Sequence, residues 1–213
     1  MITEPDVALT DYGLAVESAT FSYLLFRQKA PRPLKMWFAI FFGSVSLAAL
    51  AGGTVHGFFL DVQTIGAQVL WPITLIAIGV SALAAWAIGA KLQFPGPLSR
   101  TISAVAAAAF AGYTATVLFV SQTFLIAIVN YLPAAVFLLI VFLLVYRRTR
   151  ERSVLAGVVG LTLTFVASGV QQGGVGLHPV YFNHNATYHV IQAAALFMIF
   201  LCARRCVGTG PRK

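Results

Sequence analysis

Residues 123–152 read TFLIAIVNYLPAAVFLLIVFLLVYRRTRER, an apolar stretch that ends in a cluster of arginines. A helix needs about 20 mainly apolar residues to cross the hydrocarbon core of a bilayer, and this stretch provides them. Arginines directly after such a stretch are typical of the cytoplasmic end of a transmembrane helix. The segment therefore predicts an integral membrane protein.

The composition of the whole chain points the same way. Of the 213 residues, 59% are hydrophobic and 9% are charged, whereas about a quarter are charged in soluble domains. No linker, charge block or internal repeat divides the chain, so we predict one all-α domain over residues 1–213, a bundle of seven transmembrane helices. The predicted helices cover roughly 9–27, 34–60, 63–90, 99–121, 123–146, 153–173 and 184–203.

The charges predict the orientation of this bundle. All 14 Lys and Arg residues fall on one side of the predicted membrane, and Glu4, Asp6, Asp11 and Asp61 fall on the other. The basic side is expected to be cytoplasmic, with the N-terminus outside and the C-terminus in the cytoplasm. A basic rim of this kind explains the net charge of +8 without a nucleic-acid partner, so membrane lipids are the expected neighbours. The basic residues are Arg27, Lys29, Arg32, Lys35, Lys91, Arg100, Arg147, Arg148, Arg150, Arg152, Arg204, Arg205, Arg212 and Lys213.

The N-terminal residues are acidic rather than basic, which predicts that residues 9–27 are an uncleaved insertion signal rather than a signal peptide. Cys202 and Cys206 are expected at the cytoplasmic end of the last helix, where thiols normally stay reduced. Packing or reversible palmitoylation is the role that we expect for them.

Ionisable residues at membrane depth are costly and mark candidate functional sites. Counted from the predicted helix ends, Glu17 lies roughly 10 Å below the outer surface, and His56 and His189 each lie roughly 7 Å below it. Three helices thus place an ionisable group in one layer of the outer half. Asp11 and Asp61 are expected at the solvated rim. The other polar groups that belong to or border this layer are Asp11, Gln68, Asn130, Asn185 and Gln192.

Imidazoles together with a carboxylate suit zinc, which lowers the pKa of a bound water towards 7. We therefore predict His56, His184 and His189 as zinc ligands and Glu17 as a catalytic base or fourth ligand. Because His184 and His189 are five residues apart, they point about 140° apart on a helix, so joint ligation needs His184 to lie before the helix. The alternative is structural: His56 and His189 hydrogen-bond each other, Glu17 or the backbone. His178 is expected to be a solvated loop residue.

Two short segments resemble known families. Residues 52–58, GGTVHGF, and 182–192, FNHNATYHVIQ, resemble a family of small bacterial seven-helix proteins of uncharacterised function. More distantly, a histidine in the second helix with histidines at the seventh is similar to the superfamily of alkaline ceramidases and adiponectin receptors. That resemblance implies a zinc-dependent lipid amidase, whereas the resemblance to the small bacterial proteins implies a bacterial plasma membrane. The chain departs from the superfamily pattern at Gly52, normally Ser or Thr, at Asn185, normally His, and in having no acid in the third helix.

Two functions follow as hypotheses. The first is a metal-dependent, membrane-embedded hydrolase that acts on a lipid or an amphiphilic amide or ester. The second is a non-enzymatic protein that binds a small ligand or carries out proton-linked transport with the same Glu and His residues, since buried acids and histidines also form proton relays. A haem held by His56 and His189 is geometrically conceivable. A retinal protein is excluded because residues 184–203 contain no lysine.

Overall fold

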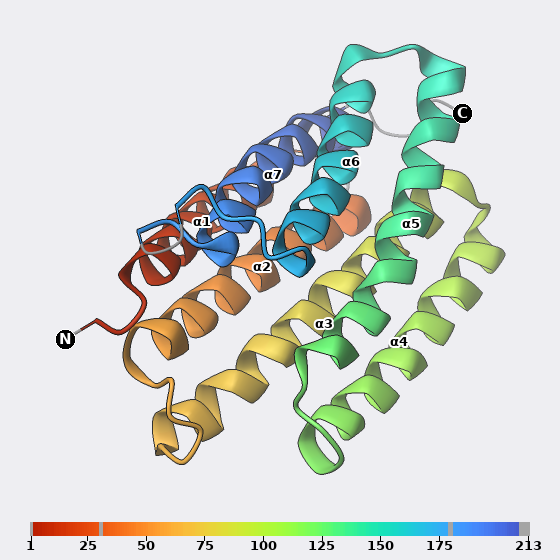
Figure 1. Cartoon of the computed structure of the whole chain (residues 1–213). Coiled ribbons are helices and arrows are strands. Elements are labelled where there is room, and N and C mark those ends of the chain that lie inside the picture. The colour runs from red at the N-terminus through yellow and green to blue at the C-terminus, as the bar shows by residue number, and fades with distance from the viewer. Residues whose placement is uncertain (1, 30–31, 179–180, 209–213) are drawn as a thin grey trace.

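The structure, a computed structural model, describes residues 2–29, 32–178 and 181–208. These residues form seven α-helices that run alternately up and down (Figure 1). The prediction of an all-α chain with seven helices is therefore confirmed. The helices are α1 (Pro5–Phe26), α2 (Arg32–Phe58), α3 (Ile65–Gln93), α4 (Gly96–Phe119), α5 (Phe124–Thr149), α6 (Arg152–Gln172) and α7 (His184–Gly208).

Local sequence explains where several helices begin and end. The side chain of Asn183 accepts hydrogen bonds from the backbone N–H groups of Asn185 (2.9 Å) and Ala186 (3.1 Å), which caps the start of α7. Thr64 caps α3 in the same way through Ala67 N–H at 3.2 Å. The apolar stretches predicted the helix ends to within a few residues. α1 begins earlier and α7 ends later than predicted, because hydropathy detects only the part of a helix that suits lipid.

Six helices form a ring. Around it, α1 packs against α2, α2 against α3, α3 against α5, α5 against α6, α6 against α7, and α7 against α1. Helix α4 lies outside this ring, mainly against α3 (Figure 1). The short link between α4 and α5 makes these helices antiparallel neighbours in the sequence. Helix α5 nevertheless packs mainly against α3 and α6 rather than against α4.

Glycines allow the closest approach between helices of the ring. A Cβ atom on Gly160 of α6 would lie 2.6 Å from the carbonyl oxygen of Ala195 on α7. Real Cβ atoms do not approach backbone so closely, so only glycine permits this contact. Small residues at such crossings are typical of helix packing in membranes.

The charges are divided between the two ends of the bundle. The described lysines and arginines lie at one end, called here the basic end, where Arg205 also pairs with Glu151 at 2.5 Å. Glu4, Asp6 and Asp61 lie at the opposite or acidic end. Arg212 and Lys213, which are predicted on the basic side, lie outside the described residues.

Within the described part of the chain, every helix except α1 is long and apolar enough to cross a membrane. Helix α1 is the exception because Asp11 and Glu17 interrupt its apolar sequence. It is held against α2 and α7, and near the basic end Phe21 of α1 stacks on Phe200 of α7 with ring centroids 4.2 Å apart. The chain therefore has the helices of a polytopic membrane protein.

Candidate functional site

The ring of six helices encloses a cavity of about 390 Å³. Residues of α1, α2, α3, α5, α6 and α7 line it, and the lining contains no residue of α4. The volume lies within the range of roughly 300–1,000 Å³ that is usual for small-molecule sites. Small side chains make room for it, among them Ala48, Ala49, Gly52, Ala82, Ala85, Ala134 and Ala135.

The wall of the cavity is polar towards the acidic end and apolar towards the basic end. Near the acidic end it carries Asp11, His56, Gln171, Asn185, His189 and Gln192. Deeper, Phe41, Leu138 and Ile199 form an apolar floor. Four aromatic residues, Trp71, Phe124, Tyr131 and Tyr188, complete the polar half. The cavity therefore has one polar half and one apolar half.

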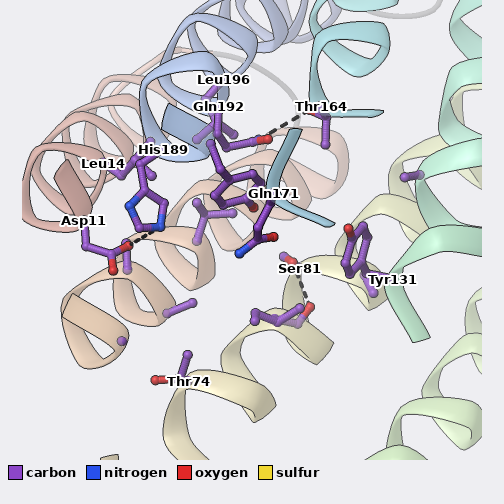
Figure 2. Close-up of a pocket in the computed structure, with 18 of the residues that line it drawn as sticks. Asp11, Leu14, Thr74, Ser81, Tyr131, Thr164, Gln171, His189, Gln192 and Leu196 are labelled. Carbon is purple, nitrogen blue, oxygen red and sulfur yellow. Dashed lines mark hydrogen bonds and ion pairs between the residues drawn. The ribbon is translucent and has the colours of Figure 1, made fainter. Parts of the chain in front are cut away.

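An acid and a histidine from different helices meet in this wall. Oδ1 of Asp11 on α1 lies 3.2 Å from Nε2 of His189 on α7 (Figure 2). Both residues are buried, with 6% and 8% of their surface exposed. A charged group is costly in such a place unless it is paired, so the contact neutralises two residues that would otherwise oppose folding.

Thr10 fixes the other side of the imidazole. Its Oγ1 lies 2.9 Å from Nδ1 of His189 and also 2.8 Å from the backbone carbonyl of Asp6. A hydroxyl has one proton, and a carbonyl can only accept. The threonine therefore donates to the carbonyl and accepts from the histidine, which places a proton on Nδ1 of His189.

One further contact ties the first turn of α1 to the start of α7. The carboxylate of Asp6 accepts a hydrogen bond from the backbone N–H of Asn183 at 3.0 Å, and Asn183 is the residue that caps α7. Asp6, Thr10 and Asp11 thus contact the same short region of the chain. They set the register between α1 and α7 on which the Asp11–His189 contact depends.

Two amides of the predicted polar layer also belong to the cavity. Oδ1 of Asn185 accepts a hydrogen bond from Gln171 at 3.1 Å. Nε2 of Gln192 donates to Oγ1 of Thr164 at 3.3 Å (Figure 2). These contacts join α6 to α7, and they place both amides in the wall that carries His189.

His56 lies where the cavity reaches the acidic end. Its Nδ1 is 2.5 Å from Oε2 of Glu4, the residue that precedes α1, and about a quarter of the histidine side chain is exposed. The backbone N–H of Thr3 donates to the carbonyl of Gly57 at 2.9 Å, which holds the start of α1 beside the end of α2. His56 therefore shares the cavity with His189 but has a partner of its own.

Other predicted site residues lie elsewhere. Glu17 is absent from the cavity lining, and its Oε2 is buried without a hydrogen-bond partner among the described residues. His184 is the first residue of α7, so it does not precede the helix as joint ligation with His189 would require. Gln68 is exposed and bonds to the Gln63 carbonyl at 3.3 Å. Asn130 lies outside the cavity lining as well.

The predicted rim position of Asp11 is wrong, because its carboxyl group is buried in the cavity wall. Asp61 is exposed, as predicted. The spacing of apolar residues in α1 indicated which of its two inner acids, Asp11 or Glu17, faces the bundle. Asp11 falls in the middle of the buried side of α1, at helical spacing from Val7, Leu14 and Ser18, whereas Glu17 lies at the edge of that side and is only partly buried.

The predicted ligand set does not gather around one point. Among the residues that the structure describes, no three His, Cys, Asp or Glu side chains are grouped so that they could hold a metal ion. His56 contacts Glu4, and His189 contacts Thr10 and Asp11. A zinc site would require His56 and His189 to give up these contacts for the metal ion, and it stays a prediction.

A family described as "Family of unknown function (DUF6962)" matches residues 7–207. The chain belongs to this family. The match begins within α1 and ends within α7, and it includes both partners of the Asp11–His189 pair. No curated protein and no solved structure matches the chain. Membership of DUF6962 names no activity, so the function has to be argued from the cavity.

Proposed function

We propose that this member of DUF6962 is a non-enzymatic membrane protein that binds a small amphiphilic molecule in its central cavity and links binding to a proton. The observation that carries the proposal is the buried Asp11–His189 pair in the wall of a cavity of about 390 Å³. Ionisable residues at membrane depth commonly mark ligand pathways and proton relays.

The shape of the cavity supports binding of an amphiphile. A polar wall near the acidic end can accept a head group, and the apolar floor around Phe41, Leu138 and Ile199 can accept a short hydrocarbon chain. Burial of each CH₂ group contributes about 0.8 kcal/mol, so a chain of several carbons binds measurably.

The metal-dependent hydrolase, with His56, His184 and His189 as ligands, has less support from this geometry. Glu17, its expected base, lies away from the cavity, and His184 lies within α7 rather than before it. That hypothesis remains open to elemental analysis of the purified protein. Stoichiometric zinc that depends on His189 would favour it over the proposal made here.

We further propose that all seven helices cross the plasma membrane, with the acidic end outside. The positive-inside rule supports this orientation, because the described lysines and arginines gather at the opposite end. The pairing of Asp11 with His189 and of Glu4 with His56 lowers the cost of placing α1 in a bilayer.

A cavity-blocking variant tests the proposed function. A Cβ atom on Gly52 would be 3.4 Å from Thr74 and 3.8 Å from Oδ2 of Asp11, so Gly52→Leu places its side chain in the polar half of the cavity. Gly112→Leu on α4 is the matched control, because a Cβ atom there meets nothing within 4 Å. Ala82→Phe blocks the cavity from α3 as a second variant.

The measurement is calorimetric titration of the protein in lipid nanodiscs with octanol, octylamine and octanoate, against empty nanodiscs. Wild type and Gly112→Leu should bind at least one of the three compounds. Gly52→Leu and Ala82→Phe should bind it at least tenfold more weakly while circular dichroism shows folded helices. Equal binding by folded blocked variants, or no binding by wild type, would contradict the proposal.

A further inference from the structure

The contacts and the burial of Asp11 and His189 determine the charge of the pair. Nδ1 of His189 donates to Thr10, so Nε2 is either a bare acceptor or carries a second proton. If neither Nε2 nor Oδ1 of Asp11, which lie 3.2 Å apart, held a proton, the buried pair would carry an uncompensated negative charge, so one of the two atoms holds a proton. Whichever atom holds it, the pair is neutral overall. Removing this proton leaves a buried negative charge facing the cavity.

Gln192, another residue of the cavity lining, carries one acceptor that lacks a donor within the described part of the chain. Oγ1 of Thr164 donates to the Gly160 carbonyl at 3.2 Å, so it must accept from Nε2 of Gln192, which fixes the orientation of that amide. Oε1 of Gln192 is then buried without a hydrogen-bond partner among the described residues. An unmet buried acceptor costs free energy, which a ligand with an N–H or O–H group would recover.

The charge of the wall favours one sign of ligand. In the part of the chain that the structure describes, the residues that line the cavity include Asp11 but neither lysine nor arginine. An anionic head would meet Asp11 and the Gln192 oxygen with no fixed cation to balance it. A cationic head would be attracted to Asp11 in its carboxylate form. The rings of Trp71 and Tyr131 in the same wall also attract cations through their faces.

We propose that the ligand of this cavity is an amphiphilic primary amine, whose ammonium group binds in place of the proton shared by Asp11 and His189. This inference rests on the proposed function. The ammonium donates hydrogen bonds to the Asp11 carboxylate and to Nε2 of His189, and its alkyl chain lies on the apolar floor. One proton leaves for the solvent at the acidic end, so the charge of the cavity is unchanged.

Charge conservation is the physical reason for the exchange. In a medium of low dielectric constant an added charge without a counter-charge is strongly disfavoured. The cavity therefore holds either one proton or one ammonium group at any time. A protein with this property couples a proton to an organic cation at a ratio of one to one.

Other ionisable groups lie near the pair, and each of the acids and histidines among them has a partner of its own. Asp6 on α1 and His56 on α2 interact electrostatically with His189, and Tyr188 on α7 and Tyr131 on α5 lie in the same wall. Asp6 is bonded to Asn183, and His56 to Glu4. The lining residues of α3 and α6 include no acid or histidine. Asp11 and His189 are therefore the pair expected to exchange the proton.

The test is titration of the protein in nanodiscs with octylamine in two buffers that differ in ionisation enthalpy, which counts the protons released. Wild type should release about one proton per amine bound. Octyltrimethylammonium has the same charge without N–H donors, and we expect it to bind at least about tenfold more weakly, because the loss of even one hydrogen bond to a charged group has that effect. Octanoate should bind worst.

Two variants complete the experiment. Asp11→Asn has no carboxyl proton to exchange, so it should bind octylamine at least tenfold more weakly, release no proton and still bind octanol. Glu17→Gln, on the same helix but away from the cavity, should behave as wild type.

The failures of the two proposals are distinguishable. If the wild type binds octanol or octanoate more tightly than octylamine, and Gly52→Leu weakens that binding, the proposal of an amine ligand is wrong and the proposed binding function still holds. Amine binding without proton release in wild type, or unchanged in Asp11→Asn, would overturn the exchange. If Gly52→Leu weakens the binding of none of these compounds, both the proposed function and the proposed amine ligand are wrong.

Discussion

His189 and Asp11 join α7 to α1 through a contact of 3.2 Å between Nε2 and Oδ1, in the wall of the central cavity. The two residues are 178 positions apart in the sequence, and Thr10 orients the imidazole from its other side. The contact links the first helix to the last, so it helps to close the ring of helices as well as to form the candidate site.

This relationship predicts energetic coupling between the two side chains. The single variants Asp11→Asn and His189→Gln and the double variant should show a coupling free energy of roughly 0.5–3 kcal/mol in a double-mutant cycle. The measurement is the free energy of unfolding in mixed micelles. The matched control is Asp11→Asn with Glu17→Gln, whose effects should add, because Glu17 does not line the cavity that the pair lines. Additive effects in both cycles would contradict the coupling.

The close approach of α6 and α7 predicts that two glycines of one helix respond differently to the same change. Gly160→Ala places a Cβ atom 2.6 Å from the Ala195 carbonyl, which forces the helices apart and should cost roughly 1–3 kcal/mol. Gly169→Ala meets nothing within 4 Å and should be neutral or stabilising by up to about 1 kcal/mol. Thermal unfolding in detergent compares them. Equal melting temperatures would show that α6 and α7 do not pack as described.

The charge asymmetry predicts the membrane topology, which single cysteines can measure in a chain with Cys202 and Cys206 replaced by alanine. Ile2→Cys and Val175→Cys, both exposed at the acidic end, should react with an impermeant maleimide on intact cells. Lys29→Cys and Thr149→Cys should react only after permeabilisation. Reaction of Ile2→Cys and Lys29→Cys from the same side would show that α1 does not cross the membrane.

The candidate site was only partly predictable. Counting from helix ends placed His56 and His189 at similar depth, and both line the cavity. The same reasoning selected Glu17 rather than Asp11. Depth follows from position along one helix, but the direction in which a side chain points depends on how that helix is rotated. Rotation was readable in part from the buried side of α1, on which Asp11 lies beside Val7 and Leu14.

The sequence by itself determined the seven helices, their approximate ends and the separation of basic from acidic residues. These features are local, because the hydropathy of about 20 consecutive residues decides whether a segment suits a bilayer, whatever its neighbours are. Only the tertiary structure decided that α4 lies outside the ring, that a cavity remains within it, and that Asp11 meets His189. Which helices become neighbours depends on side-chain packing summed over whole helices, such as the contact that Gly160 permits. No single segment of the sequence contains that sum.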